Sequence, residues 1–276
     1  MARVERQLKP RVNRRRFLSA AASASALAAQ PAGGDTRPRV LITSGRSRLA
    51  QDLAANLAEK YRVRLTERIP VETRFEFVQC ALEQDAQTRS AVRAVDAIVH
   101  VGDPLPGESS YQEIDYLARG TYNLLSAATE EHASAKKGAP RIVFLSTLEL
   151  MTPYEPDFTV SELWRPRPNL VAAVLSKHLG EYVCREFARD RKVRVIVLRL
   201  GKVVRSEEAK GFDPLWVEER DVARAVAGAL DALGQESGSA IENWWRVFHI
   251  AADSPRSRFS ITDARRVLGY QPQFRW

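Results

Sequence analysis

The sequence predicts a doubly wound α/β fold, in which helices cover both faces of a parallel sheet. Short apolar and β-branched runs alternate with longer amphipathic stretches from residue 37 onward. This alternation is typical of the strand and helix units that build a parallel sheet. About 245 residues follow the N-terminal segment, which is enough for one large domain with a substantial core.

The predicted elements follow one another along the chain. The first strand is predicted at residues 40–43, and the helix after it, at 49–60, carries Leu49, Leu53 and Leu57 on one face. Further strands are predicted at 62–66, 75–79, 97–101, 141–145 and 193–198, and further helices at 86–94, 111–128 and 172–189. Ligands of such sheets lie at the carboxyl ends of the strands, so we expect the functional residues there.

Residues 1–34 are interpreted as a targeting segment and linker that precede the folded domain at 35–276. Residues 14–18 match the twin-arginine pattern, and the mildly apolar run at 19–29 is too short to cross a bilayer. The alternative is a disordered basic arm, which gives no reason for an alanine-rich run directly after the arginines. We therefore expect export by the twin-arginine machinery to the periplasm or the extracellular space, with no membrane span in the mature form.

The net charge of +8 is concentrated in this segment. Residues 1–28 hold seven Lys or Arg and one acid, which leaves 35 basic and 33 acidic residues in the rest of the chain. A net charge of about +2 is too weak for a nucleic-acid footprint, so no nucleic-acid partner is expected. Cys80 and Cys184 are predicted to be core residues, and the four scattered histidines have no metal-ligand spacing.

Several segments carry a family resemblance together, because they occur in the right order and at the right spacing. They are residues 40–43 with the following loop, 96–100, 119–125, 144–147, Ser176-Lys177 with Glu181, 197–199, 221–225 and 264–272. Together they resemble the NAD-dependent epimerase/dehydratase family, the extended branch of the short-chain dehydrogenase/reductase superfamily, over residues 38–273. The resemblance implies an NAD(P)-binding Rossmann fold, and in similar proteins helices such as 111–128 and 172–189 pair to form a homodimer.

The resemblance implies a diphosphate site with fewer glycines than usual. The family's three glycines fall on Ser44, Ser47 and Ala50, and Gly45 is the only glycine of the loop. Small residues remain at all three places, so the turn can still close around a diphosphate at a helix N-terminus, with Arg46 and Arg48 adding positive charge. The alternative is a loop that keeps its shape for folding alone. The implied cofactor contacts are Ser44, Gly45, Arg46, Ser47 and Leu49.

Glu67 occupies the position at which the family's acid accepts hydrogen bonds from the adenosine ribose. A free ribose there indicates NAD, whereas Arg68 beside it would equally suit the 2′-phosphate of NADP, which stays open. The structural alternative is that Glu67 and Arg68 are only the solvated end of a strand.

Catalysis in the family uses a hydroxyl residue, a tyrosine and a lysine. The resemblance assigns the hydroxyl to Thr147 and the lysine, which also holds the cofactor ribose, to Lys177, but Ala173 stands where the tyrosine is expected. Positions four apart share a helix face, so the alanine leaves a gap beside Lys177. Tyr154, in the loop after the fifth strand, is the candidate for a replacement phenol. Alternatively, Lys177 is a helix residue that pairs with Glu181.

The substrate side is also reduced, because only eleven residues separate Val204 from Trp216, where sugar-nucleotide enzymes of this family carry a longer insertion. A short C-terminal cap is therefore predicted from about residue 201, and Asp221 is expected to cap the helix that starts there. Two functions remain open. One is an NAD(P)-dependent oxidoreductase or epimerase acting on a sugar or another small carbonyl compound. The other is a noncatalytic nucleotide-binding or interaction protein that retains the fold.

Overall fold

The computed structural model describes residues 35–211, 213–235 and 244–274. The chain divides into two compact units, Met1–Thr36 and Arg37–Trp276, and all of the described helices and strands belong to the second. The predicted targeting segment at 1–34 lies outside the described residues. None of the described helices is long and apolar enough to span a membrane.

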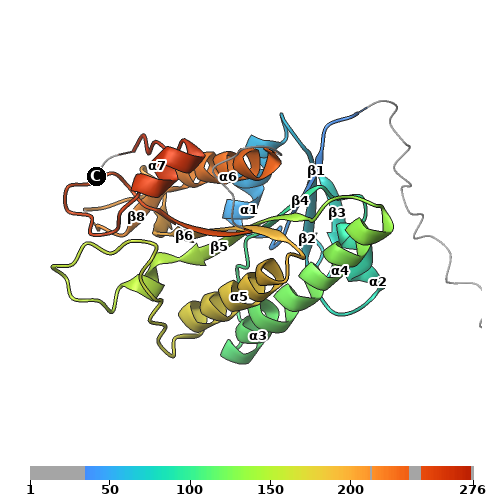
Figure 1. Cartoon of the computed structure of the whole chain (residues 1–276), viewed down its shortest axis with the longest axis horizontal. Helices are drawn as coiled ribbons and strands as arrows, with labels where there is room; N and C mark the ends of the chain where they lie inside the picture. Colours follow the sequence, from blue (N-terminus) through green and yellow to red (C-terminus); the bar gives the residue numbers. More distant parts are fainter. Residues whose placement is uncertain (1–34, 212, 236–243, 275–276) are drawn as a thin grey trace, which may run out of the picture. The chain divides into compact units, whose positions relative to one another are not determined.

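A seven-stranded, fully parallel sheet forms the centre of this unit (Figure 1). Its order is β3-β2-β1-β4-β5-β6-β9. The strands are β1 (Arg39–Ile42), β2 (Arg62–Glu67), β3 (Glu76–Gln79), β4 (Ala97–His100), β5 (Arg141–Thr147), β6 (Arg194–Leu200) and β9 (Trp245–Ile250). The order reverses between β1 and β4, and a crevice for a ligand is expected at that switch point. The predicted doubly wound architecture is confirmed.

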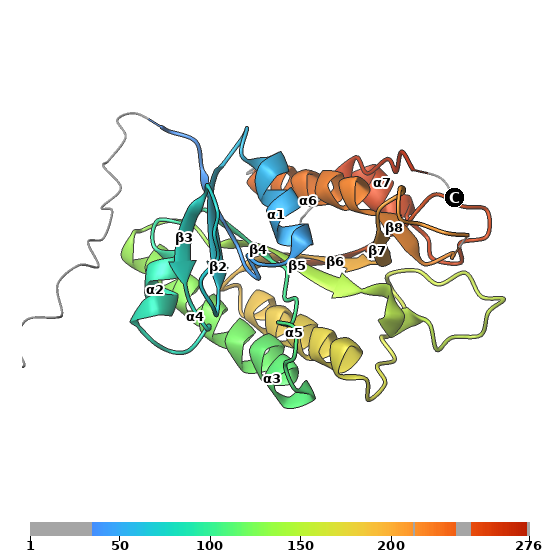
Figure 2. The same cartoon turned by 180° about the vertical axis from the view of Figure 1, so that it is seen from behind.

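Helices cover both faces of the sheet, as Figures 1 and 2 show. One face carries α1 (Arg48–Leu57), α6 (Glu219–Gly234) and α7 (Thr262–Leu268), and the other carries α2 (Ala86–Val92), α3 (Ser110–Asp115), α4 (Thr121–Ser134) and α5 (Ala172–Arg189). Successive strand residues alternate between the two core layers, so that Ile42 packs in one and Leu41 in the other. Cys80 and Cys184 are buried without a disulfide in the layer that contains α5, as predicted.

One predicted helix is divided in the structure. The stretch expected at 111–128 contains α3, a π-helical turn (Tyr116–Gly120) and α4. Ser109 starts α3 with a capping box, in which its hydroxyl accepts a hydrogen bond from the Gln112 backbone N–H and the Gln112 side chain accepts one from Ser109. Single π-turns inside helices are frequent at functional sites, and this one lies beside α5.

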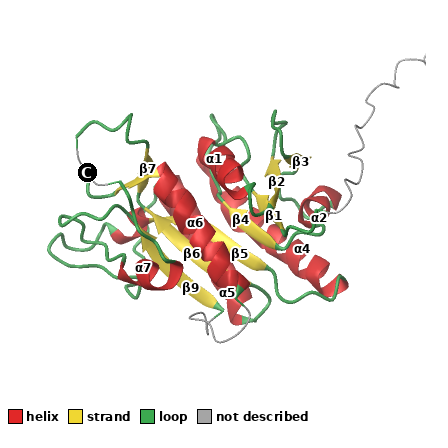
Figure 3. Ribbon diagram, turned by 90° about the horizontal axis from the view of Figure 1, so that it is seen from above, coloured by secondary structure: helices red, strands yellow, loops and turns green. Residues whose placement is uncertain are grey.

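The C-terminal cap is small. After β6 the chain forms β7 (Lys202–Val204) and β8 (Trp216–Glu218), a separate parallel pair that leads into α6. Figure 3 shows α6 lying over β5 and β6. The predicted capping role of Asp221 is wrong, because Glu218 is the N-cap and accepts the Arg220 N–H at 2.6 Å. The buried Asp221 carboxylate instead accepts the backbone N–H groups of Gln273 (2.9 Å) and Phe274 (3.2 Å), which fastens the C-terminal segment to α6.

Candidate functional site

The turn after β1 keeps the shape that glycines give it elsewhere. Ser44 has φ 55°, in the left-handed region that favours glycine. Gly45 donates its N–H to the Thr66 carbonyl at 2.9 Å, and a Cβ added there would lie 3.1 Å from the Leu65 Cβ. Gly45 therefore lies where the turn after β1 approaches β2 so closely that a side chain would need its neighbours to shift.

The N-terminus of α1 follows this turn and faces the switch point. Ser47 is the N-cap and accepts the Ala50 N–H at 3.2 Å. The N–H groups of Arg48 and Leu49, the first two helical residues, have no acceptor within an α-helix and carry the positive end of its dipole. They can donate to a diphosphate. The Arg48 side chain pairs with Glu208 at 3.0 Å and Glu219 at 3.5 Å, and its contribution of positive charge to a diphosphate stays a prediction.

Glu67 ends β2 beside this turn, and the Arg68 side chain covers it. The Glu67 carboxylate is 1% exposed and accepts the backbone N–H groups of Arg68 (2.8 Å) and Arg46 (3.4 Å). The Arg68 guanidinium pairs with Glu67 and Glu108 and lies 4.0 Å from the centroid of the Tyr116 ring. Because two carboxylates already neutralise Arg68, the arginine offers no unpaired charge for a 2′-phosphate.

The loop after β4 closes over the same turn. The Asp103 backbone donates to the Ser44 hydroxyl at 2.9 Å, and the Asp103 carbonyl accepts from Ser44 and Arg68, both at 3.3 Å. Gly102 has φ 67°, and a Cβ there would lie 2.4 Å from Leu117 Cδ2. These contacts join the ends of β1, β2 and β4 at the switch point.

His100, which was not singled out from the sequence, connects neighbouring elements at the switch point through both of its ring nitrogens. Thr43 Oγ1 accepts the Val101 N–H (3.0 Å) and lies 2.8 Å from His100 Nδ1. On the other side, His100 Nε2 lies 3.0 Å from Thr121 Oγ1, whose hydroxyl donates to the Leu117 carbonyl. Because the Thr121 hydroxyl proton is committed to Leu117, His100 Nε2 must be the donor to Thr121, and in a neutral ring Nδ1 then accepts from the Thr43 hydroxyl. Burial, with help from the charge of Lys177, lowers the pKa of His100 to about 3.

Lys177 reaches from α5 to the carboxyl ends of the central strands. Its Nζ donates to the carbonyl of Val101, just after β4, at 2.6 Å and to that of Leu145 in β5 at 2.9 Å. Burial lowers the pKa of this lysine, and the negative charges of Asp103 and Glu113 partly oppose the shift. The lysine therefore lies at the switch point, with its ammonium held by backbone carbonyls.

The remaining catalytic candidates are less closely gathered. Thr147 ends β5, two residues after Leu145, and its hydroxyl accepts the Glu149 N–H at 3.1 Å. Ala173 is exposed in the first turn of α5, so no phenol stands there. The Tyr154 hydroxyl donates to the Arg165 carbonyl at 2.6 Å, and the Arg167 guanidinium lies 4.0 Å from the centroid of its ring. That phenol would have to leave this bond to act on a substrate, and its replacement role stays a prediction.

Glu181 does not serve Lys177 as the structural alternative supposed. It pairs with Arg199 of β6 through two hydrogen bonds, at 2.9 and 2.8 Å, and both side chains are at most 5% exposed. A bidentate pair of this kind fixes both groups and leaves Lys177 to its backbone acceptors.

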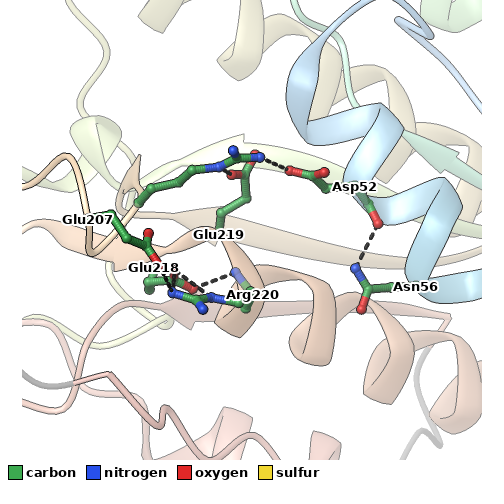
Figure 4. Close-up of a pocket in the computed structure, with 7 residues that line it drawn as sticks. Asp52, Asn56, Glu207, Glu218, Glu219 and Arg220 are labelled. Carbon is green, nitrogen blue, oxygen red and sulfur yellow. Dashed lines mark hydrogen bonds and ion pairs between the residues drawn. The ribbon is translucent and has the colours of Figure 1, made fainter.

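A hollow lies away from the switch point, between α1 and the cap. It measures about 310 Å³ and is lined by Asp52, Asn56, Arg205, Glu207, Glu218, Glu219 and Arg220 (Figure 4). Its charged side chains pair among themselves, with Arg205 joining Asp52 to Glu219 and Arg220 joining Glu207 to Glu218. We interpret this network as the contact that holds the short cap on α1.

Comparison with known proteins places this architecture in a family. Residues 40–229 match the NAD dependent epimerase/dehydratase family, which covers more than half of the chain. The chain belongs to that family. This confirms the resemblance carried by the sequence, and the family's dependence on NAD supports the predicted cofactor.

Several sugar dehydrogenases resemble the chain along most of its length. An NAD-dependent glucose-6-phosphate dehydrogenase of Haloferax volcanii is 23% identical over 258 residues, 85% of this chain and 92% of the relative. Uronate dehydrogenase of Agrobacterium tumefaciens, in a tyrosine-to-alanine mutant complexed with NAD, superimposes with a TM-score of 0.71 at 22% identity, covering 86% of this chain and 85% of that one. Glucuronic acid dehydrogenase of Chromohalobacter salexigens gives 0.69, at 22% identity and the same coverage.

Proposed function

We propose that this protein binds NAD at the switch point between β1 and β4 and acts as an oxidoreductase or epimerase on a sugar or another small carbonyl compound. The observation that carries the proposal is the preserved turn at Ser44–Gly45 together with the N–H groups of Arg48 and Leu49 at the start of α1. A serine kept at φ 55° and a glycine where a Cβ would be crowded are consistent with a turn that lets a diphosphate approach the backbone.

The relatives support the type of substrate. The glucose-6-phosphate, uronate and glucuronic acid dehydrogenases all act on sugars, as their names state, and the chain matches most of each. The uronate dehydrogenase mutant, with one tyrosine replaced by alanine, still forms a complex with NAD. That precedent is consistent with cofactor binding in a chain with Ala173.

We assign some residues of the site to binding the cofactor and others to holding the substrate and moving its proton. Arg48 and Leu49 would donate to the diphosphate, and Glu67 would accept from the ribose once Arg68 turns away from it. NAD supplies a nicotinamide that exchanges a hydride with the substrate. Thr147 would hold the substrate oxygen, while Lys177 would place its charge near the cofactor ribose. We propose Tyr154 as the group that moves the proton, which requires its bond to Arg165 to break.

A noncatalytic role is the second candidate, and two observations favour it. Lys177 already satisfies its ammonium with the carbonyls of Val101 and Leu145, and Ala173 offers no proton donor. Such a protein would bind NAD to stabilise a surface for another molecule without turnover.

Titration of the purified protein with NAD and NADP by calorimetry tests cofactor binding. We expect NAD to bind with a Kd below about 1 mM, in the range of ordinary enzyme ligands, and NADP to bind more weakly because its 2′-phosphate would face Glu67. Arg68→Ala should retain or strengthen NAD binding, since it uncovers Glu67. If neither protein binds NAD at that concentration, the proposal is wrong.

The variant Ala173→Tyr serves as the second arm of this experiment. The position is exposed in the first turn of α5, so the phenol can be added without overfilling the core. General acid–base groups contribute on the order of 10²–10⁴ in rate, so turnover of sugar substrates should rise at least tenfold if the cleft is otherwise intact. Unchanged turnover with normal NAD binding would favour the noncatalytic role.

Two predicted partnerships also remain proposals. We infer export by the twin-arginine route, in which case replacing Arg14 and Arg15 with lysine should retain the protein in the cytoplasm, as fractionation would show.

We infer a homodimer through α4 and α5, which present Tyr122 and Tyr182 at 55% and 57% exposure. A monomeric mass by light scattering would exclude it.

A further inference from the structure

A larger cavity lies at the opposite edge of the sheet from β3. It measures about 600 Å³, within the range of small-molecule sites, and lies between α5, the edge strand β9 and the loop at 162–166. Its walls include His178, Tyr182 and Arg185 from α5 and Trp245 from β9. Two strands, β5 and β6, separate β9 from the switch point, so this cavity is distinct from the proposed cofactor crevice.

The buried pair of Arg199 and Glu181 lines this cavity. Glu181 occupies Nε and one terminal nitrogen of Arg199, but the other terminal nitrogen meets only the sulfur of Met151, at 3.4 Å. A thioether is a weak acceptor, so a deeply buried guanidinium keeps donor capacity that the protein does not fill. Hydrophobic residues of similar volume would commonly serve stability equally well.

His178 provides a second unfilled polar position in the same wall. Its Nδ1 is buried and has no hydrogen-bond partner within the described part of the chain. Buried polar atoms are nearly always bonded, so an orphan that lines a cavity points to a group that enters the cavity.

The mouth of the cavity carries excess positive charge. Arg165 and Arg185 both line it, and neither forms an ion pair among residues 35–211, 213–235 and 244–274. The only carboxylate facing them, apart from paired Glu181, is Glu162 within the described lining, and it accepts the His249 backbone N–H at 3.2 Å. Burial raises the pKa of Glu162, which weakens its opposition to an incoming anion.

Flat aromatic surfaces complete the cavity. Trp164, Trp245 and Tyr182 all line it, and Trp164 is held edge-on against Tyr154 with ring centroids 4.7 Å apart. Aromatic faces with a few polar groups are typical of sites for ring-shaped ligands, and guanidinium groups match the geometry of a carboxylate.

We propose that this cavity is a second binding site, for a small ring compound that carries a carboxylate. The carboxylate would lie between Arg185 and Arg165, and the ring would pack against Trp245 and Trp164. The inference stands apart from the proposed function, because no residue of the cavity belongs to the NAD crevice.

Calorimetric titration with benzoate, and with benzyl alcohol as its uncharged counterpart, tests this site in the intact protein. We expect benzoate to bind and benzyl alcohol to bind at least tenfold more weakly. Because charge-assisted hydrogen bonds are about twice as strong as neutral ones, Arg185→Ala should weaken benzoate binding about tenfold, and adding Arg165→Ala should weaken it further.

Arg189→Ala is the matched control. Arg189 lies one turn further along α5, outside the cavity, and pairs with Glu186 at 2.7 Å. None of these three arginines belongs to the buried core, so the variants should fold, and their NAD titration should equal that of the unmodified chain. Equal affinity for benzoate and benzyl alcohol, or equal benzoate affinity of the Arg165/Arg185 double variant and Arg189→Ala, would overturn the proposal.

Discussion

Replacing Glu181 by alanine is expected to destabilise the protein by about 3–5 kcal/mol, measured as the free energy of unfolding in urea at neutral pH. The change leaves Arg199 charged, at most 5% exposed, and bonded only to the Met151 sulfur. Without the carboxylate, the buried guanidinium has no partner of opposite charge. The free-energy cost of removing this charge from water therefore destabilises the folded state.

The double variant Glu181→Leu with Arg199→Met removes the whole ion pair. Comparing it with the single variant distinguishes the cost of leaving Arg199 buried without a partner from the loss of the ion pair itself. It removes both charges and keeps similar volumes, and buried pairs exchanged for apolar residues in this way are often neutral or stabilising. We expect its stability to lie within about 1–2 kcal/mol of the original. If the single variant is as stable as the unmodified protein, or if the double variant is the less stable of the two, this interpretation of the pair is incorrect.

The strands and helices that could be predicted are those with a strong local pattern. The helix expected at 172–189 has those bounds in the structure, because its apolar face repeats clearly and Val171 precedes it in an extended conformation. The edge strand β9 was not predicted, since Trp245, Arg246 and Val247 are all only partly buried and resemble a loop rich in aromatic residues. Nor was the π-turn at Tyr116–Gly120, because a single inserted residue hardly disturbs helical periodicity.

The site was predictable as a set of positions and less so as a set of contacts. The family resemblance placed Ser44 and Lys177 at the switch point, where the structure has them. It could not show that Arg68 folds back over Glu67 and Tyr116, since that arrangement depends on Glu108 in a distant loop. Nor could it reveal the His100 network, whose members come from three separate elements.

Lowering the pH from 7 to 5 is expected to reduce stability by about 2–4 kcal/mol, through two buried histidines. Burial lowers the pKa of His100 and of His249 to about 3 each, whereas an unfolded histidine titrates near 6.5. Below about pH 6.5 the unfolded chain therefore binds two protons that the folded protein does not bind. The stability contributed by the neutral rings is complete above that pH and is lost as pH falls toward the folded pKa, at about 1.4 kcal/mol per pH unit for each ring.

The window between pH 7 and 5 separates this effect from that of ordinary carboxylates, which titrate near pH 4. Glu162 opposes it in part, because burial raises its pKa and the folded state gains a proton there as pH falls. Urea unfolding at several pH values should show the decline. Stability that is flat from pH 7 to 5 in the unmodified protein would contradict this prediction, because it would mean that both rings take up protons while the chain remains folded.

Two single variants assign the decline to its rings. His249→Leu removes a ring whose nitrogens have no hydrogen-bond partner in the described chain, so it should halve the slope without a large loss at pH 7. His100→Asn should also halve the slope but begin from a lower stability, since it disturbs the bonds to Thr43 and Thr121. A slope that neither variant changes would mean that the lost stability comes from groups other than these histidines, because each ring contributes through its own proton and independently of the other.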